Sequence, residues 1–108
     1  MTLATVAVEE TGDDTVRIAV AGEVDLVNAT TVEQRITEAI TNQVSAVTLD
    51  LTALEYIDSA GLRVLFTLAA RLETLQIAIE LVVAPKSSVR RLVDLSGLAT
   101  AMPVRSAV

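Results

Sequence analysis

Asp58 and Ser59 stand side by side in the middle of the chain and form the pair of residues best suited to chemistry. They open a segment that continues as Ala60-Gly61-Leu62, and a polar residue followed by small ones is typical of the start of a helix. Asp58 or Ser59 could simply cap that helix. Alternatively, Ser59 could accept a phosphate, because free N–H groups and the helix dipole at a helix N-terminus favour an added dianion.

Gly61 is an unusual residue for the first turn of a helix. Glycine inside a helix costs about 1 kcal/mol relative to alanine. Its presence therefore predicts that another part of the molecule approaches the backbone closely at this position.

A second polar segment, Gly22-Glu23-Val24-Asp25, follows an apolar run and precedes a predicted helix. Taken alone it is explained as a solvated loop. In an α/β protein, however, strand ends and helix starts gather at one edge of the sheet. We therefore expect Glu23, Asp25, Asp58 and Ser59 to lie at the same edge.

The composition excludes several classes of site. The 108 residues include no His, no Cys and no Trp, and the two aromatic residues are Tyr56 and Phe66. The chain can therefore form no disulfide or thiol nucleophile and has no imidazole for general base catalysis or zinc binding. Asp25 and Asp58 could hold a magnesium ion for a small hydrolase, but no further ligand or base is placed with them.

The charge of the chain argues against nucleic acid and membrane partners. The formal net charge is −6, which repels phosphate backbones and anionic lipid surfaces, and two aromatic residues cannot form a stacking platform for bases. Residues 1–58 carry a net charge of −9 and residues 59–108 a net charge of +3. The acidic half is the part expected to contact a basic partner.

No segment is typical of membrane insertion or secretion. The longest uncharged run in the apolar middle, residues 64–70, is far shorter than the roughly 18 residues that a transmembrane helix needs. The N-terminal residues lack a basic region followed by an apolar one. We therefore expect a soluble cytoplasmic protein.

The elements that must position these residues follow from hydrophobic periodicity and turn signals. Residues 4–8 and 16–20 predict a hairpin across a turn at 11–14, and the order along the whole chain is β-β-α-β-α-β-α. The remaining predicted elements are a helix at 29–42, a strand at 46–51, a helix from Asp58 or Ser59, a strand at 77–84, a helix from Ser87 or Ser88 to Ser96-Gly97, and a weak strand or tail from Ala101.

The first helix carries the most detailed end signals. Asn28 is the expected N-cap, Val27 and Val32 are spaced to form a hydrophobic staple across it, and Asn42 can end the helix. Together, the elements predict a single domain over residues 1–108. Its fold class is α/β, with a mixed sheet of four to five strands and helices packed on it.

Five short blocks of the sequence, in their order and spacing, resemble the STAS domain of bacterial anti-sigma factor antagonists. The Asp-Ser-Ala-Gly-Leu block at Asp58–Leu62 is the specific element, and the resemblance covers essentially the whole chain. The other blocks are Gly22-Glu23-Val24-Asp25, Leu49-Asp50-Leu51, Val89-Arg90-Arg91-Leu92 and Leu95-Ser96-Gly97-Leu98.

The resemblance implies a partner-switching module with no catalytic activity and no cofactor of its own. In that family the unphosphorylated antagonist binds an anti-sigma factor, which is also a serine kinase that uses ATP, and so frees a sigma factor. Phosphorylation of the serine that corresponds to Ser59 ends the binding, and a PP2C-type phosphatase reverses it. The mixed sheet is the fold that the resemblance implies as well.

The resemblance also implies roles for particular residues. Ser59 would accept the phosphate, and Asp25 and Asp58 would shape the contact edge and position Ser59. Glu23 would either contact the partner or remain solvated. Ala60, Gly61 and Leu62 complete the expected partner-binding set.

One departure from the family pattern concerns the loop before residues 77–84. Many relatives have a glycine there, whereas this chain has Leu75-Gln76. A reading without a switch also stays open: the same domain could be a constitutive scaffold or subunit of a larger assembly, such as a stressosome or a lipid-transport ATPase complex.

Overall fold

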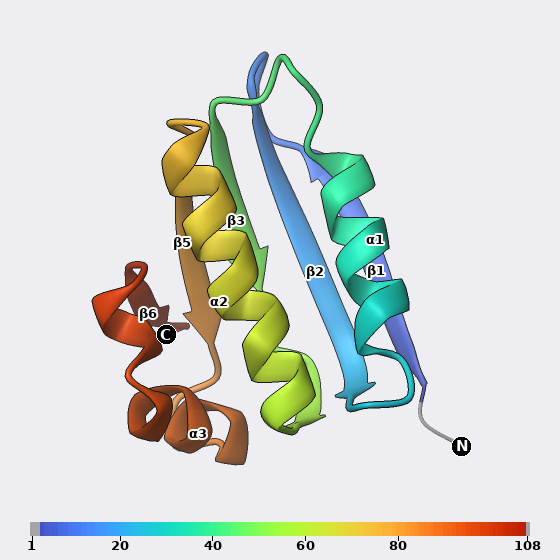
Figure 1. Cartoon of the computed structure of the whole chain (residues 1–108), viewed down its shortest axis with the longest axis vertical. Coiled ribbons are helices and arrows are strands. Elements are labelled where there is room, and N and C mark those ends of the chain that lie inside the picture. Colours follow the sequence, from blue (N-terminus) through green and yellow to red (C-terminus); the bar gives the residue numbers. More distant parts are fainter. Residues whose placement is uncertain (1–2, 108) are drawn as a thin grey trace.

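The computed structural model of the chain describes residues 3–107 and shows one sheet with helices packed on it (Figure 1). The strands and helices within these residues are β1 (Ala4–Glu10), β2 (Thr15–Val24), α1 (Ala29–Ala39), β3 (Ala46–Asp50), β4 (Leu54–Ile57), α2 (Ser59–Thr74), β5 (Ala78–Val83), α3 (Ser88–Ser96), the short 3₁₀ helix η1 (Leu98–Thr100) and β6 (Val104–Ser106).

The sheet is mixed, as the sequence predicts. Strands β1 and β2 form an antiparallel hairpin, and every other pairing is parallel. The strand order is β1-β2-β3-β5-β6, and β4 pairs with β2 outside this path. The predicted α/β fold class is therefore confirmed, although the sheet has six strands over residues 3–107 instead of four to five.

Strand β4 is the element that the periodicity failed to predict. It is four residues long, follows β3 after only three residues, and shows its outer residues buried and its middle ones exposed. The strand is too short, and its burial too irregular, to show the alternation of apolar and polar residues that identifies a strand in a sequence. The pairing of β4 nonetheless positions the site, because Ile57 lies beside Val24 at the end of β2.

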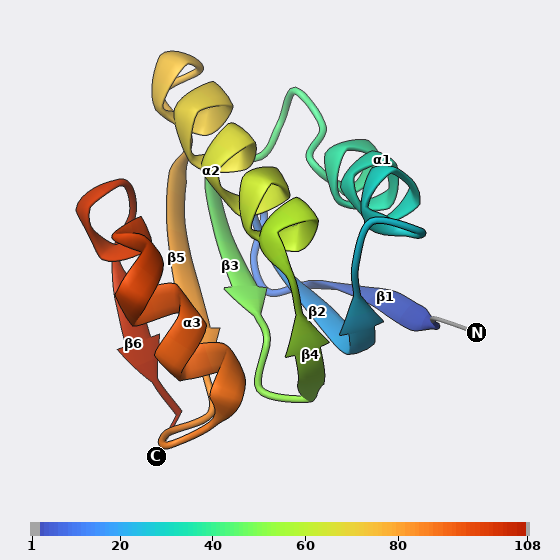
Figure 2. The same cartoon turned by 60° about the horizontal axis from the view of Figure 1, so that its bottom comes forward.

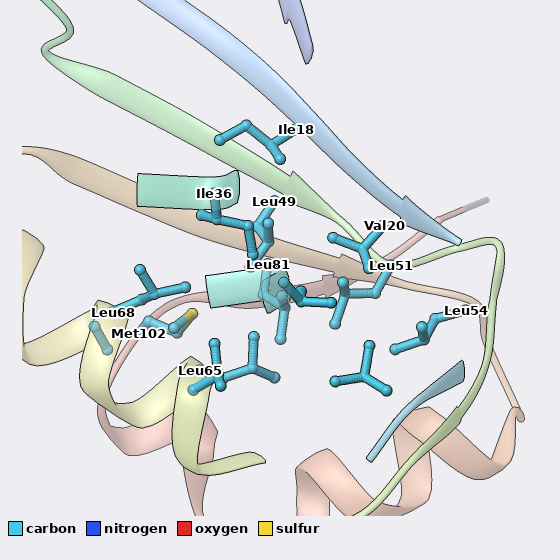
Figure 3. Close-up of a cluster of buried hydrophobic side chains, with 14 of the residues drawn as sticks. Ile18, Val20, Ile36, Leu49, Leu51, Leu54, Leu65, Leu68, Leu81 and Met102 are labelled. Atoms are coloured by element: carbon cyan, nitrogen blue, oxygen red, sulfur yellow. The ribbon is translucent and has the colours of Figure 1, made fainter. Parts of the chain in front are cut away.

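Helices α1 and α2 lie side by side on one face of the sheet (Figure 2). Helix α3 packs against β4. The core fills the space between the sheet and these helices. Figure 3 shows side chains from β2, β3, β5, α1 and α2 meeting there. Ile18, Leu49 and Leu81 of the sheet and Leu68 of α2 are among the fully buried members. The alternation along each strand places the three sheet residues on the helix-covered face.

The ends of α1 differ from the prediction. The Asn28 side chain makes no cap hydrogen bond to α1, and the helix ends at Ala39, with Ile40 as its C-cap, instead of at Asn42. The expected staple is also wrong, because Val27 is 80% exposed while Val32 is buried. Asn28 and Val27 instead form part of the loop between β2 and α1, which is described below.

The ends of α3 agree with the prediction. Ser87 Oγ accepts a hydrogen bond from Arg90 N, and Gly97 adopts a left-handed conformation at the C-cap. Val89 and Val93 are buried, and Arg91 is exposed. Across residues 3–107, no helix is both long enough and apolar enough to span a membrane.

Candidate functional site

Asp58 joins two segments that are distant in the sequence. Its Oδ1 accepts hydrogen bonds from Ala60 N at 2.9 Å and Gly61 N at 3.1 Å, so it is the N-cap of α2. Its Oδ2 accepts a hydrogen bond from Leu26 N at 3.2 Å, in the loop between β2 and α1. One carboxylate thus fixes the start of α2 against this loop.

The β2–α1 loop is further held by its own polar side chains. Asp25 Oδ1 accepts a hydrogen bond from Val27 N at 2.8 Å, and Asn28 Oδ1 accepts one from Asp25 N at 3.0 Å. Asn28 Nδ2 donates to the Glu23 carbonyl oxygen at 2.9 Å. Asn28 therefore closes the loop instead of capping α1, because a side-chain amide can satisfy nearby backbone groups in a turn.

Ser59 is the first residue of α2 and is exposed. Its hydroxyl makes no hydrogen bond with any residue between 3 and 107. The expected free N–H groups beside it are, however, in use: those of Ala60 and Gly61 bond to Asp58 Oδ1. The predicted capping by Asp58 is therefore confirmed, and these two N–H groups could bond a phosphate only if the cap were displaced.

Gly61 is needed because the backbone is approached closely, as the sequence predicts. A Cβ at this position would lie 2.5 Å from Ile57 Cγ1 and 3.1 Å from Val24 Cγ1. Gly61 is therefore buried against the ends of β2 and β4. Its contribution is to let α2 start at this point.

Two large apolar side chains project from the loop beside Ser59. Leu26 and Val27 are 82% and 80% exposed, and Leu26 N is bonded to Asp58. Leu26 also borders a groove of about 250 Å³ between α1 and α2, whose other lining residues are Ala29, Thr30, Glu33, Ala60, Arg63, Val64 and Thr67. Exposed apolar residues at the edge of a groove are typical of a protein contact surface.

We refer to residues 23–27 and 58–63 as the Ser59 surface. The structure brings together the predicted residues Glu23, Asp25, Asp58 and Ser59 on it, through the pairing of β2 with β4. Glu23 is exposed and Ala60 lines the groove. Leu62 is partly buried and packs against the core.

Sequence reasoning missed four residues of this region as candidates for binding, namely Leu26, Val27, Glu33 and Arg63. Leu26 carries the clearest signal, since two adjacent apolar residues in a polar loop are unusual, but Val27 was assigned to a staple instead. Arg63 and Glu33 line the groove from α2 and α1. Their meeting depends on how the two helices pack, which no local pattern reveals.

Asp50, from the Leu49-Asp50-Leu51 block, lies on the face of the sheet opposite α1 and α2. It forms an ion pair with Arg17 and accepts a hydrogen bond from Thr52 N at 2.9 Å. Burial acts to raise the pKa of Asp50, but hydrogen bonds from Thr52 and the nearby Arg17 outweigh it, so the pKa lies below its ordinary value of 3.8. Its role is to stabilise the sheet.

The carboxylates of the Ser59 surface are not arranged as metal ligands. Asp58 uses both oxygens for backbone N–H groups, and Asp25 Oδ1 accepts from Val27 N. Within residues 3–107, no three acidic side chains come together as a potential metal site. The arrangement supports the capping of a helix and the ordering of a loop, and gives no support to a magnesium-dependent hydrolase.

Comparison with known proteins identifies the family. Residues 5–108 match the STAS domain family. RsfB of Mycobacterium tuberculosis, named an anti-sigma-F factor antagonist, is 34% identical over 82 residues, which are 75% of this chain and 65% of that protein. The chain therefore spans just under two thirds of the length of this relative.

Solved structures show the same fold. An anti-sigma factor antagonist from Mycobacterium paratuberculosis matches with a TM-score of 0.79 and 31% identity, over 94% of this chain and 85% of that one. The unphosphorylated form of the anti-sigma factor antagonist SpoIIAA matches with a TM-score of 0.77 and 23% identity, over 96% of this chain and 89% of that one. From its sequence match and its fold, this chain belongs to the STAS domain family.

Proposed function

We propose that this STAS domain is an anti-sigma factor antagonist that is switched off by phosphorylation at Ser59. In the unphosphorylated state it binds an anti-sigma factor through the Ser59 surface, so that a sigma factor is released. In the phosphorylated state it no longer binds. The observation that carries the proposal is the exposed hydroxyl of Ser59 beside the exposed side chains of Leu26 and Val27.

The relatives support this proposal through what they are named. RsfB and the protein from Mycobacterium paratuberculosis are both anti-sigma factor antagonists. SpoIIAA, with which this chain shares its fold, has been solved in an unphosphorylated and a phosphorylated form. The serine of the block that carries the resemblance is the residue that the fold leaves exposed at the start of α2.

The proposed partner is an anti-sigma factor that is also a serine kinase. Phosphorylation forms a bond between Ser59 Oγ and the γ-phosphorus of ATP, releases ADP and passes the hydroxyl proton to the kinase or to solvent. A PP2C-type phosphatase hydrolyses the ester and restores the antagonist. The antagonist itself catalyses neither step and needs no cofactor, since the kinase binds the ATP. Its proposed location is the cytoplasm.

The energetics of the switch are adequate. A phosphoserine carries about −1.5 to −2 charges at pH 7, and it would enter a surface that already contains Glu23, Asp25 and Asp58. An unpaired charge buried in an interface costs roughly 2–5 kcal/mol, and each 1.4 kcal/mol is a tenfold change in affinity. One phosphate can therefore weaken the complex by about 30-fold or more.

Phosphate mapping after an affinity pull-down from the source cell tests the proposal. The captured anti-sigma factor, incubated with ATP and magnesium, should phosphorylate the parent chain at Ser59 and dissociate from it. Ser59→Ala should stay bound and take up no phosphate. Ser88→Ala is the matched control, because Ser88 is also an exposed first residue of a helix, and it should behave like the parent.

Two results would contradict the proposal. One is phosphate uptake by Ser59→Ala at the parental level. The other is a tight complex that ATP leaves unchanged, which would instead support the constitutive scaffold or subunit of a larger assembly.

A further inference from the structure

Arg63 lies one helical turn after Ser59 on α2, so that the two residues are related as i and i+4. Residues with this spacing are neighbours on a helix surface. Long side chains on a helix lean toward its N-terminus and cover the preceding turn. Arg63 is exposed and borders the groove together with Ala60 and Leu26, and its guanidinium is therefore within reach of a group attached to Ser59 Oγ.

Arg63 has no acidic partner on its own helix. The residues three and four positions away are Ser59, Ala60, Phe66 and Thr67, and the acid of α2 is Glu73, ten residues further on. No salt bridge among residues 3–107 involves Arg63. Glu33 of α1 lines the same groove and is the acid that competes for the guanidinium across it.

A phosphate on Ser59 can obtain few of its hydrogen bonds from the start of α2. The N–H groups of Ala60 and Gly61 are bonded to Asp58 Oδ1, and Leu62 N is bonded to the Asp58 carbonyl oxygen at 2.9 Å. Using them would require displacement of the cap. A cationic side chain on the same helix face is a further source of donors, and Arg63 occupies that position.

We propose that Arg63 is the residue that binds the phosphate on Ser59 and thereby stabilises the switched-off form. The inference relies on the proposed function in one respect, namely that Ser59 is phosphorylated. An acidic group four residues before a basic one is the favourable orientation on a helix, and guanidinium binds phosphate through two parallel hydrogen bonds. Phosphorylation thus adds negative charge and also removes Arg63 from the groove.

The test uses phosphoserine introduced at position 59 during translation, so that no kinase is needed. A ³¹P NMR titration then gives the second pKa of the phosphate, which is about 6 for free phosphoserine. Arg63→Gln should raise this pKa by roughly 0.3 to 1 unit, and Arg63→Lys should restore most of the parental value. The acids of this region, Glu23, Asp25, Glu33 and Asp58, act on the phosphate in every variant, so that the differences report on residue 63.

Arg71→Gln is the matched control, since it removes the same charge from the same helix. Arg71 lies twelve residues beyond Ser59, or about 18 Å along the helix, where salt screens the interaction. It should leave the phosphate pKa unchanged. Equal pKa values for Arg63→Gln and the parent would overturn the inference, as would equal shifts for Arg63→Gln and Arg71→Gln.

The same samples separate this inference from the proposed function. If phosphoserine at 59 fails to weaken binding to the anti-sigma factor but Arg63→Gln raises the phosphate pKa, the switch fails and the Arg63 assignment stands. If binding is lost while the pKa does not depend on residue 63, the switch stands and the Arg63 assignment fails.

Discussion

Helices α2 and α3 begin with the same local arrangement. Each has a polar N-cap, Asp58 or Ser87, whose side chain accepts hydrogen bonds from backbone N–H groups in the first turn. Each also has an exposed serine as its first residue, Ser59 or Ser88. By the rules of helix capping alone, the two serines are equivalent.

The surroundings of the two helix starts differ. The Asp58 carboxylate also bonds Leu26 N in a separate loop, whereas Ser87 Oγ bonds within its own segment, to Arg90 N and the Ala84 carbonyl oxygen. The open groove beside α3, of about 660 Å³, is lined mainly by Lys86, Ser87, Ser88, Arg90, Arg91, Asp94 and Leu95. A phosphate on Ser88 would therefore meet several basic residues, while one on Ser59 would meet a surface that is acidic and apolar apart from Arg63. The proposed switch depends on this setting, and the helix start alone does not provide it.

Among the variants that test the difference between the two helix starts, Leu26→Asp is expected to have the largest effect. It places a charge in the apolar part of the Ser59 surface, and we expect the affinity for the proposed anti-sigma factor to fall about 30-fold or more. Leu95→Asp, on α3, is the control, because Leu95 is similarly exposed, at 74%. Isothermal titration calorimetry measures both, and equal losses would show that the partner does not distinguish the two surfaces.

Asp58→Ala should destabilise the fold by about 2 kcal/mol, since it removes the cap of α2 and the bond to the β2–α1 loop. Ser87→Ala removes only a local cap and should cost about 1 kcal/mol. Urea denaturation gives both free energies of unfolding. An Asp58→Ala variant no less stable than Ser87→Ala would mean that the bond to Leu26 N contributes nothing.

Gly61→Ala should destabilise the fold by about 1–2 kcal/mol, because the overpacking against Ile57 exceeds the gain in helix propensity. The third residue of α3 is Arg90, and Arg90→Ala should change stability by about 0.5 kcal/mol. Thermal unfolding followed by circular dichroism distinguishes them. A stabilised Gly61→Ala variant would disprove the close approach.

Gln76→Gly extends the comparison to the helix ends and should stabilise the fold by about 0.5–1 kcal/mol. Gln76, just beyond α2, has a φ of 60°, and Gly97, just beyond α3, has a φ of 80°. Glycine adopts this left-handed conformation without the strain that a side chain introduces. Gly97→Ala should correspondingly cost about 1 kcal/mol. Unfolding in urea measures both, and a destabilised Gln76→Gly variant would contradict the account.

The sequence predicts the parts of the fold that depend on local patterns. The apolar spacing of α2 predicts a buried face that includes Leu65, Ala69 and Leu72, which are buried, and also Leu75, which is exposed. The cap of α3 at Ser87 and the close approach at Gly61 also follow from residue type, because only a few residues satisfy those conformations.

The parts that were missed depend on contacts between distant segments. Asn28 has the right type and place for an N-cap, but the Glu23 carbonyl oxygen and Asp25 N offer its side chain other partners. Strand β4 exists because β2 extends beyond β3 and leaves room for a second parallel neighbour. Arg63 becomes a candidate only when α2 and α1 are seen to border one groove.

The bonds from Asp58 to both α2 and Leu26 have a consequence for how Ser59 can be recognised. Many protein kinases read their substrates as extended peptides laid across the active site. Ser59 cannot be presented in that form without unwinding the first turn of α2 and breaking these bonds. The proposed kinase would therefore have to accept the intact domain, so that phosphorylation of Ser59 and binding of the unphosphorylated domain would use one rigid surface.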